Sequence, residues 1–447
     1  MTGTPNIADL GLLRVDDYRD QDGIVFLTGL LDRYGECVRY QTGVGRFIVI
    51  NHPSVVHELS RNDNFRRLSF LQIVLGQGLL TSEGAWWRRQ RQLAQPMFTP
   101  ERVSAFGDLW TAQTLERLPA WRAHADSGEP LDVADEMTRL ALNIVLRALF
   151  GYEVAEKPVL ELLQALQAVM ADMSELATTA FAASQTMTPA RQRAFRDTMG
   201  VLERTVADII ARRRGATATP DDLLTRLMTS RIEETGELLS DRQIRDEIVT
   251  LLVAGHETTS LALDWTWYLL DRNPQAEARL HEELDAALRG RTPSIDDLPR
   301  LGWTAMVVKE ALRMYPPVWY FNRRARREGT IGNIPIAAGE IIAVCVYSVH
   351  RHRDFWRNQE TFDPSRFSDV NPDRRQLKAF VPFGSGRHLC LGIHFALMES
   401  ALILATLAQR FRVRPIPGRT VTMEPGLTLR MHGGLPARIE HRIAGNA

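Results

Sequence analysis

Hydrophobic and polar residues along the chain follow a mainly helical pattern. The longest helical segment runs from Ser240 to Arg272 without a proline and stops before Pro274. Ser240 and Gln243 stand in capping-box spacing at its start. Its middle, "IVTLLVAG", is apolar, which predicts a buried helix about 45 Å long.

Three further helices and three strand regions follow from the same pattern. The helices are expected at 274–288, 304–315 and 392–410. Strand signals occur in "RFIVI", in "IPIAAGEIIAVCVY" and in "LTLRMHGGLPARIE". These elements predict a mainly α fold with a small β region. Because the chain has no internal repeat and no low-complexity linker, we expect one domain over 1–447.

Composition narrows the functional classes. The 447 residues are 45% hydrophobic, enough for a large core, and 54 basic residues balance 54 acidic ones. A neutral chain has no overall field for nucleic acid or anionic membranes. Three widely spaced cysteines argue against a disulfide framework. The first residues show no basic and apolar leader, so we expect a soluble cytoplasmic protein without a membrane anchor.

The segment "FGSGRHLCLG" at 383–392 carries the first candidate chemistry. It places Cys390 just before a predicted helix, where free backbone N–H groups and the helix dipole favour the thiolate. Gly384 and Gly386 let the loop turn and approach a flat group, and Gly392 permits tight entry into the helix. Phe383 is expected to cover the sulfur with an apolar ring. A buried, inert cysteine in a glycine turn is the alternative.

Other uses of this loop fail on spacing. Leu389 stands where a dinucleotide fingerprint needs glycine, and Phe383 and Arg387 occupy the glycine positions of a hydrolase elbow around Ser385. A zinc site would need a second nearby cysteine, and none is present.

The loop resembles the haem-binding signature of the cytochrome P450 family, with Phe383, Gly386, Cys390 and Gly392 on matching positions. His388 stands where the general pattern has arginine, as in many bacterial members. The resemblance implies haem b with Cys390 as the axial thiolate ligand, and the P450 fold, with haem between the long helix and the cysteine-led one.

The long helix contains a polar segment, "AGHETTS", at 254–260. Glycine and buried polar groups are costly there, although threonine can bond back to the preceding turn, so a local kink beside Gly255 is expected. A zinc-protease motif is excluded because Ser260 replaces the second histidine. A polar cluster that serves only packing is the plain alternative.

This segment also resembles the oxygen-binding motif of the P450 family, with Gly255, Glu257 and Thr258 on matching positions. The resemblance implies that Ala254 and Gly255 leave room for O₂. It further implies that Thr258 and Glu257 are catalytic and relay protons, since heterolytic O–O cleavage consumes two of them.

Arginine-containing motifs complete the resemblance. Glu310 and Arg313, three apart on one helix, with Arg366 downstream, resemble the family's structural triad. Haem propionates need cationic or polar partners from several segments; family spacing implies the following set: Trp87, Arg91, Arg323 and His388. The arginine clusters come without a nucleic-acid recognition motif. We therefore expect Arg88 and Arg89 to face an acidic electron donor.

The resemblance implies a haem monooxygenase that oxidises a lipophilic substrate, in secondary metabolism, with O₂. No flavin or nicotinamide motif is present, so electrons are expected from a ferredoxin and its reductase, and the protein is expected to be a monomer. A peroxide-driven peroxygenase and a non-enzymatic haem protein are the alternatives. The substrate chamber is expected to be built from four segments: 70–82, 170–187, 318–321 and the terminal hairpin near Leu427.

Overall fold

The computed structural model describes residues 7–13, 22–43, 45–67, 71–181, 188–218, 220–232, 236–370 and 373–442, with side chains of 176–181 excepted. The longer helices are α1 (Gly23–Tyr34), α4 (Gly84–Ala94), α6 (Gly107–Ser127), α7 (Val133–Phe150), α8 (Glu156–Phe181), α9 (Pro189–Gly215), α11 (Asp241–Arg272), α12 (Pro274–Leu288), α13 (Gly302–Met314) and α16 (Ile393–Ala408). The shorter helices are α2 (Pro53–Leu59), α3 (Gln72–Leu75), α5 (Pro100–Ser104), α10 (Leu223–Thr229), α14 (Val346–Val349) and α15 (Arg374–Ala379).

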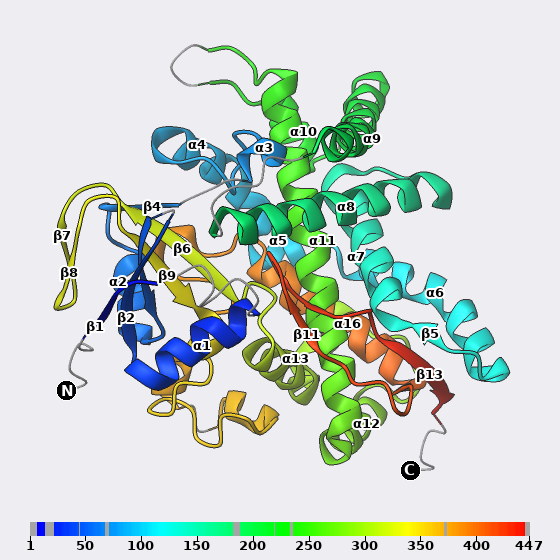
Figure 1. The fold of residues 1–447 in the computed structure, drawn as a ribbon. Helices are drawn as coiled ribbons and strands as arrows, with labels where there is room; N and C mark the ends of the chain where they lie inside the picture. The colour runs from blue at the N-terminus through cyan, green and yellow to red at the C-terminus, as the bar shows by residue number, and fades with distance from the viewer. Residues whose placement is uncertain are drawn as a thin grey trace.

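Helix α11 is the axis of the helical region (Figure 1). Its 32 residues begin at the capping box, in which Ser240 N donates to Gln243 Oε1 at 2.8 Å and Gln243 N donates back to Ser240 Oγ at 3.3 Å. The helix ends at Arg272, one residue before Pro274 starts α12. Both predicted boundaries are confirmed, and the helix continues through Gly255, where we expected a local kink.

The strands form one larger sheet and three small ones. The larger sheet has the order β1 (Ala8–Leu12), β2 (Cys37–Thr42), β3 (Gly45–Ile50), β9 (Ile341–Cys345), β6 (Tyr320–Ala325) and β4 (Phe65–Arg67). The small sheets are β10 (Phe411–Pro415) with β13 (Pro436–His441) and β5 (Leu131–Asp132), β11 (Met423–Pro425) with β12 (Leu429–Met431), and β7 (Gly329–Ile331) with β8 (Ile334–Ile336). The larger sheet lies to one side of the helical region (Figure 1).

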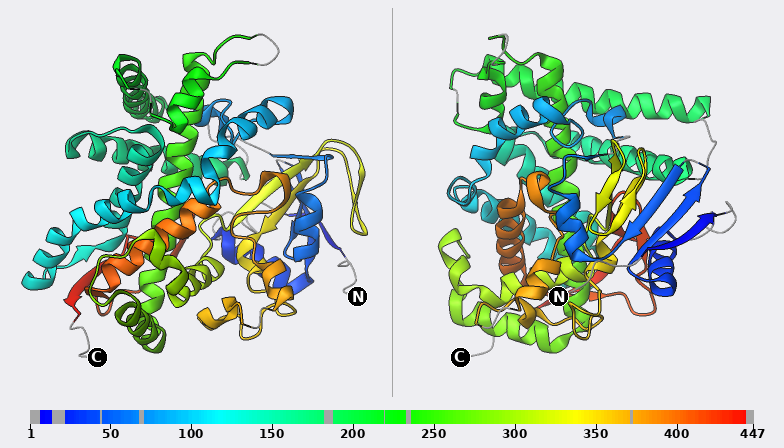
Figure 2. Two further views of the ribbon diagram at one scale, coloured as in Figure 1. Left: turned by 180° about the vertical axis from the view of Figure 1, so that it is seen from behind. Right: turned by 90° about the vertical axis from the view of Figure 1, so that its left-hand side faces the viewer.

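The mainly α fold with a small β region is therefore confirmed. The predicted helices at 274–288, 304–315 and 392–410 correspond to α12, α13 and α16. Helix α16 packs against α6, α13 and α11. In the left view of Figure 2, which shows the molecule from behind, α16 crosses α11. The core between these helices holds the largest side chains, including the fully buried Trp110, Trp121, Trp265 and Trp267.

A buried ion pair fixes α13 to the segment that follows α14. Arg313 Nε and Nη2 donate to the two carboxylate oxygens of Glu310, each at 2.7 Å, and both side chains are fully buried. Arg366 Nε reaches Glu310 Oε1 at 3.3 Å, and Arg313 Nη1 donates to the carbonyl oxygens of His350 and Gln359. The three residues that resembled the structural triad lie together, and backbone oxygens satisfy the remaining N–H groups of Arg313.

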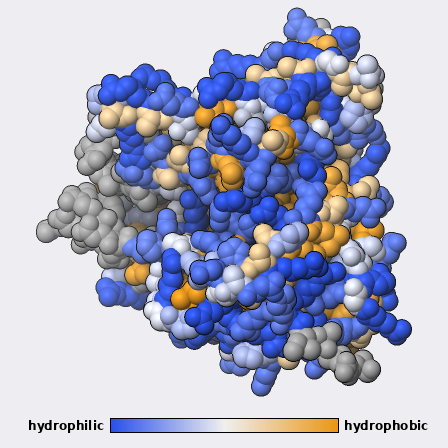
Figure 3. All heavy atoms as spheres, turned by 90° about the vertical axis from the view of Figure 1, so that its right-hand side faces the viewer, coloured by the Kyte–Doolittle hydropathy of each residue, from blue (hydrophilic) through white to orange (hydrophobic). Residues whose placement is uncertain are grey.

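The outer surface is largely hydrophilic, with apolar side chains scattered between polar ones in the view of Figure 3. Among the described residues, no helix combines the length and apolar character needed to cross a membrane.

Candidate haem site

The cysteine loop turns on two glycines before α16 begins. Gly384 and Gly386 have φ values of +71° and +66°, which L side chains rarely adopt. At Gly386 a Cβ atom would also lie 2.6 Å from the backbone oxygen of Ser60, so the loop approaches the segment after α2 too closely for a side chain. Cys390 N donates to Phe383 O at 2.9 Å and closes the loop.

Cys390 is accessible to solvent, yet protein atoms surround it on most sides. The thiol therefore faces an internal space. Burial raises its pKa, and the Gly392 N–H and the Arg91 guanidinium oppose that rise without cancelling it. The backbone N–H at the helix start favours the thiolate as expected, while desolvation acts in the opposite direction and is the larger effect.

Gly392 shows a different geometry from the loop glycines. Its φ is −89°, and a Cβ atom built there would meet nothing within 4 Å. Neither helix entry nor packing against the described residues requires glycine, contrary to our expectation of a tight entry. The bare backbone two residues after Cys390 instead leaves room for a flat group.

The opposite side of the candidate site is a stripe along α11. Leu251, Ala254, Gly255 and Thr258 are accessible or half-accessible, whereas the residues between and beside them are buried. Spacings of three and four put these positions on one helix face, so this face borders an internal space. Thr258 Oγ1 donates to Ala254 O at 2.8 Å, the expected bond to the preceding turn.

Gly255 is also explained by helix packing. A Cβ atom there would lie 3.0 Å from Cγ2 of Val145 on α7. The glycine therefore lets α11 and α7 approach closely, whatever room it leaves on the accessible face.

Glu257 points away from that face and meets the β11–β12 hairpin. Its Oε1 accepts from Arg430 Nε at 2.7 Å, from Arg430 Nη2, and from Thr428 Oγ1 at 3.1 Å. Its Oε2 is buried and has no hydrogen-bond partner among the described residues. Sequence reasoning missed Arg430 and Thr428, because 171 to 173 residues separate them from Glu257 and no short motif connects them.

The predicted propionate partners converge beside the cysteine loop. The rings of Trp87 and His388 are in contact, with centroids 4.2 Å apart and planes tilted by 55°. Burial lowers the pKa of His388 to about 3, and four guanidiniums reinforce that shift, those of Arg67, Arg323, Arg387 and Arg91. His388 Nδ1 is buried without a partner among the described residues.

We call Arg67, Arg91 and Arg323, whose charges all act on the neutral His388, the cationic cluster. Arg67 and Arg323 are paired across β4 and β6, and burial followed by the repulsion of Arg67 lowers the pKa of Arg323 to about 10. The one acidic group that offsets them is Glu83, which accepts from Arg67 Nε at 3.0 Å. The cluster therefore carries an excess of positive charge.

Arg67 was not among the predicted site residues. No short motif marks Arg67 in the sequence, because the register between β4 and β6 is what brings it opposite Arg323. Arg91, which was predicted, donates from Nη1 to Leu389 O at 2.9 Å and lies close enough to Cys390 for its charge to act on the thiol. Arg91 thus supports the cysteine loop directly.

Three of the four segments expected to line a substrate chamber meet at the tip of the β11–β12 hairpin, whereas Gln77 and Leu79 of the fourth contact the start of α11. Leu427 N donates to Ser174 Oγ of α8 at 3.0 Å, and Trp319 Nε1 donates to Gly426 O at 2.9 Å. Met170 and Met173 on α8 are buried. Residue 70 and residues 182–187 of the expected chamber lie outside the described residues.

These donors fit a haem. The enclosed but accessible thiol suits an iron ion. The open backbone beside it and the accessible stripe on α11 suit a flat macrocycle. The excess of cations and the unpartnered His388 nitrogen suit two carboxylates. The residues present are therefore compatible with a bound haem.

The comparisons agree. The chain belongs to the cytochrome P450 family, whose sequence profile matches residues 13–437. Cyclooctatin synthase of Streptomyces melanosporofaciens is 33% identical over 408 residues, which cover 89% of this chain and 87% of that protein. Cyclooctat-9-en-7-ol 5-monooxygenase of the same organism is 32% identical over 395 residues, which cover 88% and 85%. Pentalenene oxygenase of Streptomyces avermitilis is 32% identical over 421 residues, which cover 91% and 92%.

Family membership and these relatives establish an oxidoreductase, a P450 monooxygenase of secondary metabolism. The family uses a haem-thiolate cofactor, O₂, a lipophilic substrate and redox partners.

Proposed function

We propose that Cys390 ligates the iron of haem b, and that the haem lies between the cysteine loop and the accessible stripe of α11. The observation that carries this proposal is the enclosed but accessible thiol at the start of α16, a helix that packs against α11. Phe383, Gly384 and Gly392 would border the haem on the cysteine side, and Ala254 and Gly255 would border it on the other.

The cationic cluster, together with Trp87 and His388, would hold the two propionates. His388 Nδ1 is buried without a hydrogen-bond partner among the described residues, and the Trp87 ring lies against the His388 ring. A haem carboxylate would satisfy this nitrogen and neutralise Arg323, which Glu83 alone does not offset. We therefore add Arg67 to the propionate partners that the family resemblance implies, which are Trp87, Arg91, Arg323 and His388.

Haem with a thiolate ligand supplies reductive activation of O₂ and transfer of one oxygen atom to the substrate. The chain supplies protons and positions the reactants. Thr258 Oγ1 keeps its lone pairs available on the accessible face while its proton bonds to Ala254 O. Arg430 holds Oε1 of Glu257, and its Oε2, which has no partner among the described residues, is available for proton exchange with water in a relay to Thr258. We propose these two residues as the catalytic pair.

We propose a lipophilic cyclic terpenoid as substrate, with hydroxylation or a related oxidation as the outcome. Supporting this, the relatives include one named for cyclooctat-9-en-7-ol and another named for pentalenene. The apolar residues near the hairpin tip, Leu427, Trp319 and Met170, are of the type that a lipophilic substrate requires.

The electron donor, the oligomeric state, the location and the domain count are also part of this proposal. A ferredoxin and its reductase would supply electrons, and the exposed Arg88 and half-buried Arg89 on α4 would face the acidic donor. We further propose a monomeric, cytoplasmic protein with one domain over 1–447.

Turnover of the purified holoenzyme with a panel of cyclic terpenes tests the function. Ferredoxin, reductase, NAD(P)H and O₂ should give monooxygenated product in excess of that obtained with hydrogen peroxide. Comparable or higher product with peroxide alone would instead indicate a peroxygenase. Absence of both product and substrate-induced shifts in the haem spectrum would contradict the proposed substrate class.

A further inference from the structure

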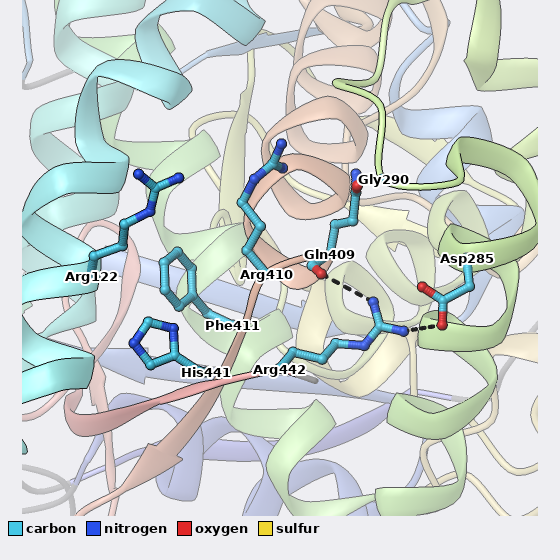
Figure 4. Close-up of a pocket in the computed structure, with 8 residues that line it drawn as sticks. All are labelled: Arg122, Asp285, Gly290, Gln409, Arg410, Phe411, His441 and Arg442. Carbon is cyan, nitrogen blue, oxygen red and sulfur yellow. Dashed lines mark hydrogen bonds and ion pairs between the residues drawn. The ribbon is translucent and has the colours of Figure 1, made fainter. Parts of the chain in front are cut away.

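A second pocket lies at the C-terminal end of α16, away from the residues assigned to haem. It has a volume of about 330 Å³ and is formed where α6, the loop after α12, β10 and β13 meet (Figure 4). Its lining residues are Arg122, Asp285, Gly290, Gln409, Arg410, Phe411, His441 and Arg442. Three of the eight are arginines, and Phe411 is fully buried beneath them.

Two of the basic groups in this pocket already have acidic partners. Arg442 pairs with Asp285 and donates from Nη1 to Gln409 O at 3.1 Å, as the dashed lines in Figure 4 show. His441 Nε2 lies 2.6 Å from Asp126 Oδ1. The one carboxylate that lines the pocket, that of Asp285, is therefore engaged.

Within the described part of the chain, Arg122 and Arg410 have no acidic partner. Arg122 makes no hydrogen bond or ion pair among the described residues, and Arg410 donates only to Thr406 O, at 2.8 Å. Burial lowers the pKa of Arg410, and the positive charge of Arg122 adds to that effect, so the two guanidiniums lie near each other. Figure 4 shows both side chains extending toward the same side of the pocket.

The surroundings add to the positive charge. His281, whose carbonyl oxygen accepts from Arg442 Nη2 at 3.4 Å, has a buried Nδ1 without a partner among the described residues. Burial lowers its pKa to about 3, and the charges of Arg442, Arg412 and Arg414 lower it further. Arg414 is itself paired with Asp271, Glu277 and Glu440, so the arginines that line the pocket without an acidic partner among the described residues are Arg122 and Arg410.

We propose that Arg122 and Arg410 bind a phosphate group, either free phosphate or the phosphate of a small organic ester, in a site separate from the haem. Two guanidiniums offer forked N–H donors that match phosphate oxygens, and their combined charge balances a dianion. A volume of about 330 Å³ is at the lower end of small-ligand pockets, so it would hold a phosphate with a small organic part.

Calorimetric titration of the holoenzyme at low ionic strength tests this site, with inorganic phosphate and glycerol phosphate as probes. Sodium chloride at matched ionic strength is the control ligand. We expect saturable binding of at least one phosphate probe with one site per chain. The double variant R122Q/R410Q should weaken that binding at least tenfold, whereas R193Q, which removes an exposed arginine on α9, should leave it unchanged.

The two probes distinguish the source of the phosphate. Tighter binding of glycerol phosphate would assign an organic ester, and tighter binding of inorganic phosphate would assign the free ion. No saturable binding, equal binding of chloride, or undiminished binding by R122Q/R410Q would overturn the proposal. Because binding is measured directly, and none of these residues belongs to the proposed haem site, either result is independent of the proposed monooxygenase function.

Discussion

Arg430 Nε lies 2.7 Å from Glu257 Oε1 and joins the C-terminal hairpin to the centre of α11. Glu257 is buried, and Arg430 is about one-quarter exposed. The pair holds the carboxylate of the residue that precedes Thr258 against the hairpin. A single arginine from the far end of the chain thus maintains the proposed proton donor.

Replacing Arg430 should therefore destabilise the protein through Glu257. R430Q leaves a buried carboxylate without its charge partner, and losses of about 3–5 kcal/mol are typical of such changes. Thermal unfolding of the holoenzyme at pH 7 should show a clearly lower midpoint, and E257Q/R430Q should recover part of the loss. R438Q, which changes an exposed arginine on the neighbouring strand β13, is the matched control. Equal midpoints for R430Q and R438Q would show that the pair contributes nothing.

Removing the Thr258 hydroxyl should uncouple electron use from product formation. Proton relay by a positioned side chain typically contributes 10²- to 10⁴-fold, so T258A should form product at least tenfold more slowly while NAD(P)H consumption falls less. T258S retains Oγ and is the control, expected to stay near the parent. The measurement is product and hydrogen peroxide formed per NAD(P)H. Unchanged coupling in T258A would remove Thr258 from the proton path.

The cationic cluster predicts the strength of haem retention. R67Q and R323Q each remove a charge expected to face a propionate, so haem should transfer to a scavenging haem protein several-fold faster from either variant. R66Q alters the neighbouring residue on β4, which is exposed, and should release haem at the parent rate. If R66Q and R67Q behave alike, the propionates are held elsewhere.

Glu247 on α11 predicts a pH dependence of stability. Burial raises its pKa from 4.5 to about 8; Oε2 accepts from Leu79 N at 3.2 Å, whereas Oε1 has no partner among the described residues. The folded state binds the proton more tightly than the unfolded chain. The stability from this group is therefore complete below pH 4.5 and is lost as the pH rises through 8.

Substitution by glutamine removes this titration. The unfolding midpoint of E247Q should rise relative to the parent between pH 4.5 and 8, by an amount equivalent to a few kcal/mol, since one pKa unit corresponds to about 1.4 kcal/mol. E282Q, which changes an exposed residue on α12, should follow the parent. A constant difference between E247Q and the parent across this range would mean that Glu247 ionises normally.

The Arg313–Glu310 pair predicts a large loss of stability. R313A would leave the Glu310 carboxylate buried without its bidentate partner, at a cost of about 3–5 kcal/mol, and would strand the carbonyl oxygens of His350 and Gln359. Soluble yield and unfolding midpoint should both fall. K309A on the same helix is the control, and a similar effect of both variants would contradict a specific role for Arg313.

The sequence predicted those parts of the fold and site that depend on local patterns. The capping box and Pro274 fixed the ends of α11, because both act within a few residues. Positions of Cys390 and Thr258 followed from short motifs. Partners that come from tertiary register could not be found in this way: Arg430 reaches Glu257 through the hairpin, and Arg67 reaches its place opposite Arg323 through strand pairing.

Two further features of the cysteine loop depend on surroundings that the sequence does not reveal. The helix N-terminus and Arg91 do favour a thiolate at Cys390, but desolvation outweighs both, and the extent of burial is not visible in the sequence. Similarly, Gly392 was expected to serve helix entry, whereas its ordinary φ and open surroundings make it relevant to what lies beside the loop.

The absorption spectrum of the reduced, CO-bound protein tests the central claim most directly. The parent and C37A, which changes a buried cysteine remote from α16 in sequence, should both show the Soret band at the long-wavelength position of thiolate-ligated haem. C390A should lose that band. A shorter-wavelength band in the parent, or a thiolate band that survives in C390A, would contradict the assignment of Cys390 as the haem ligand.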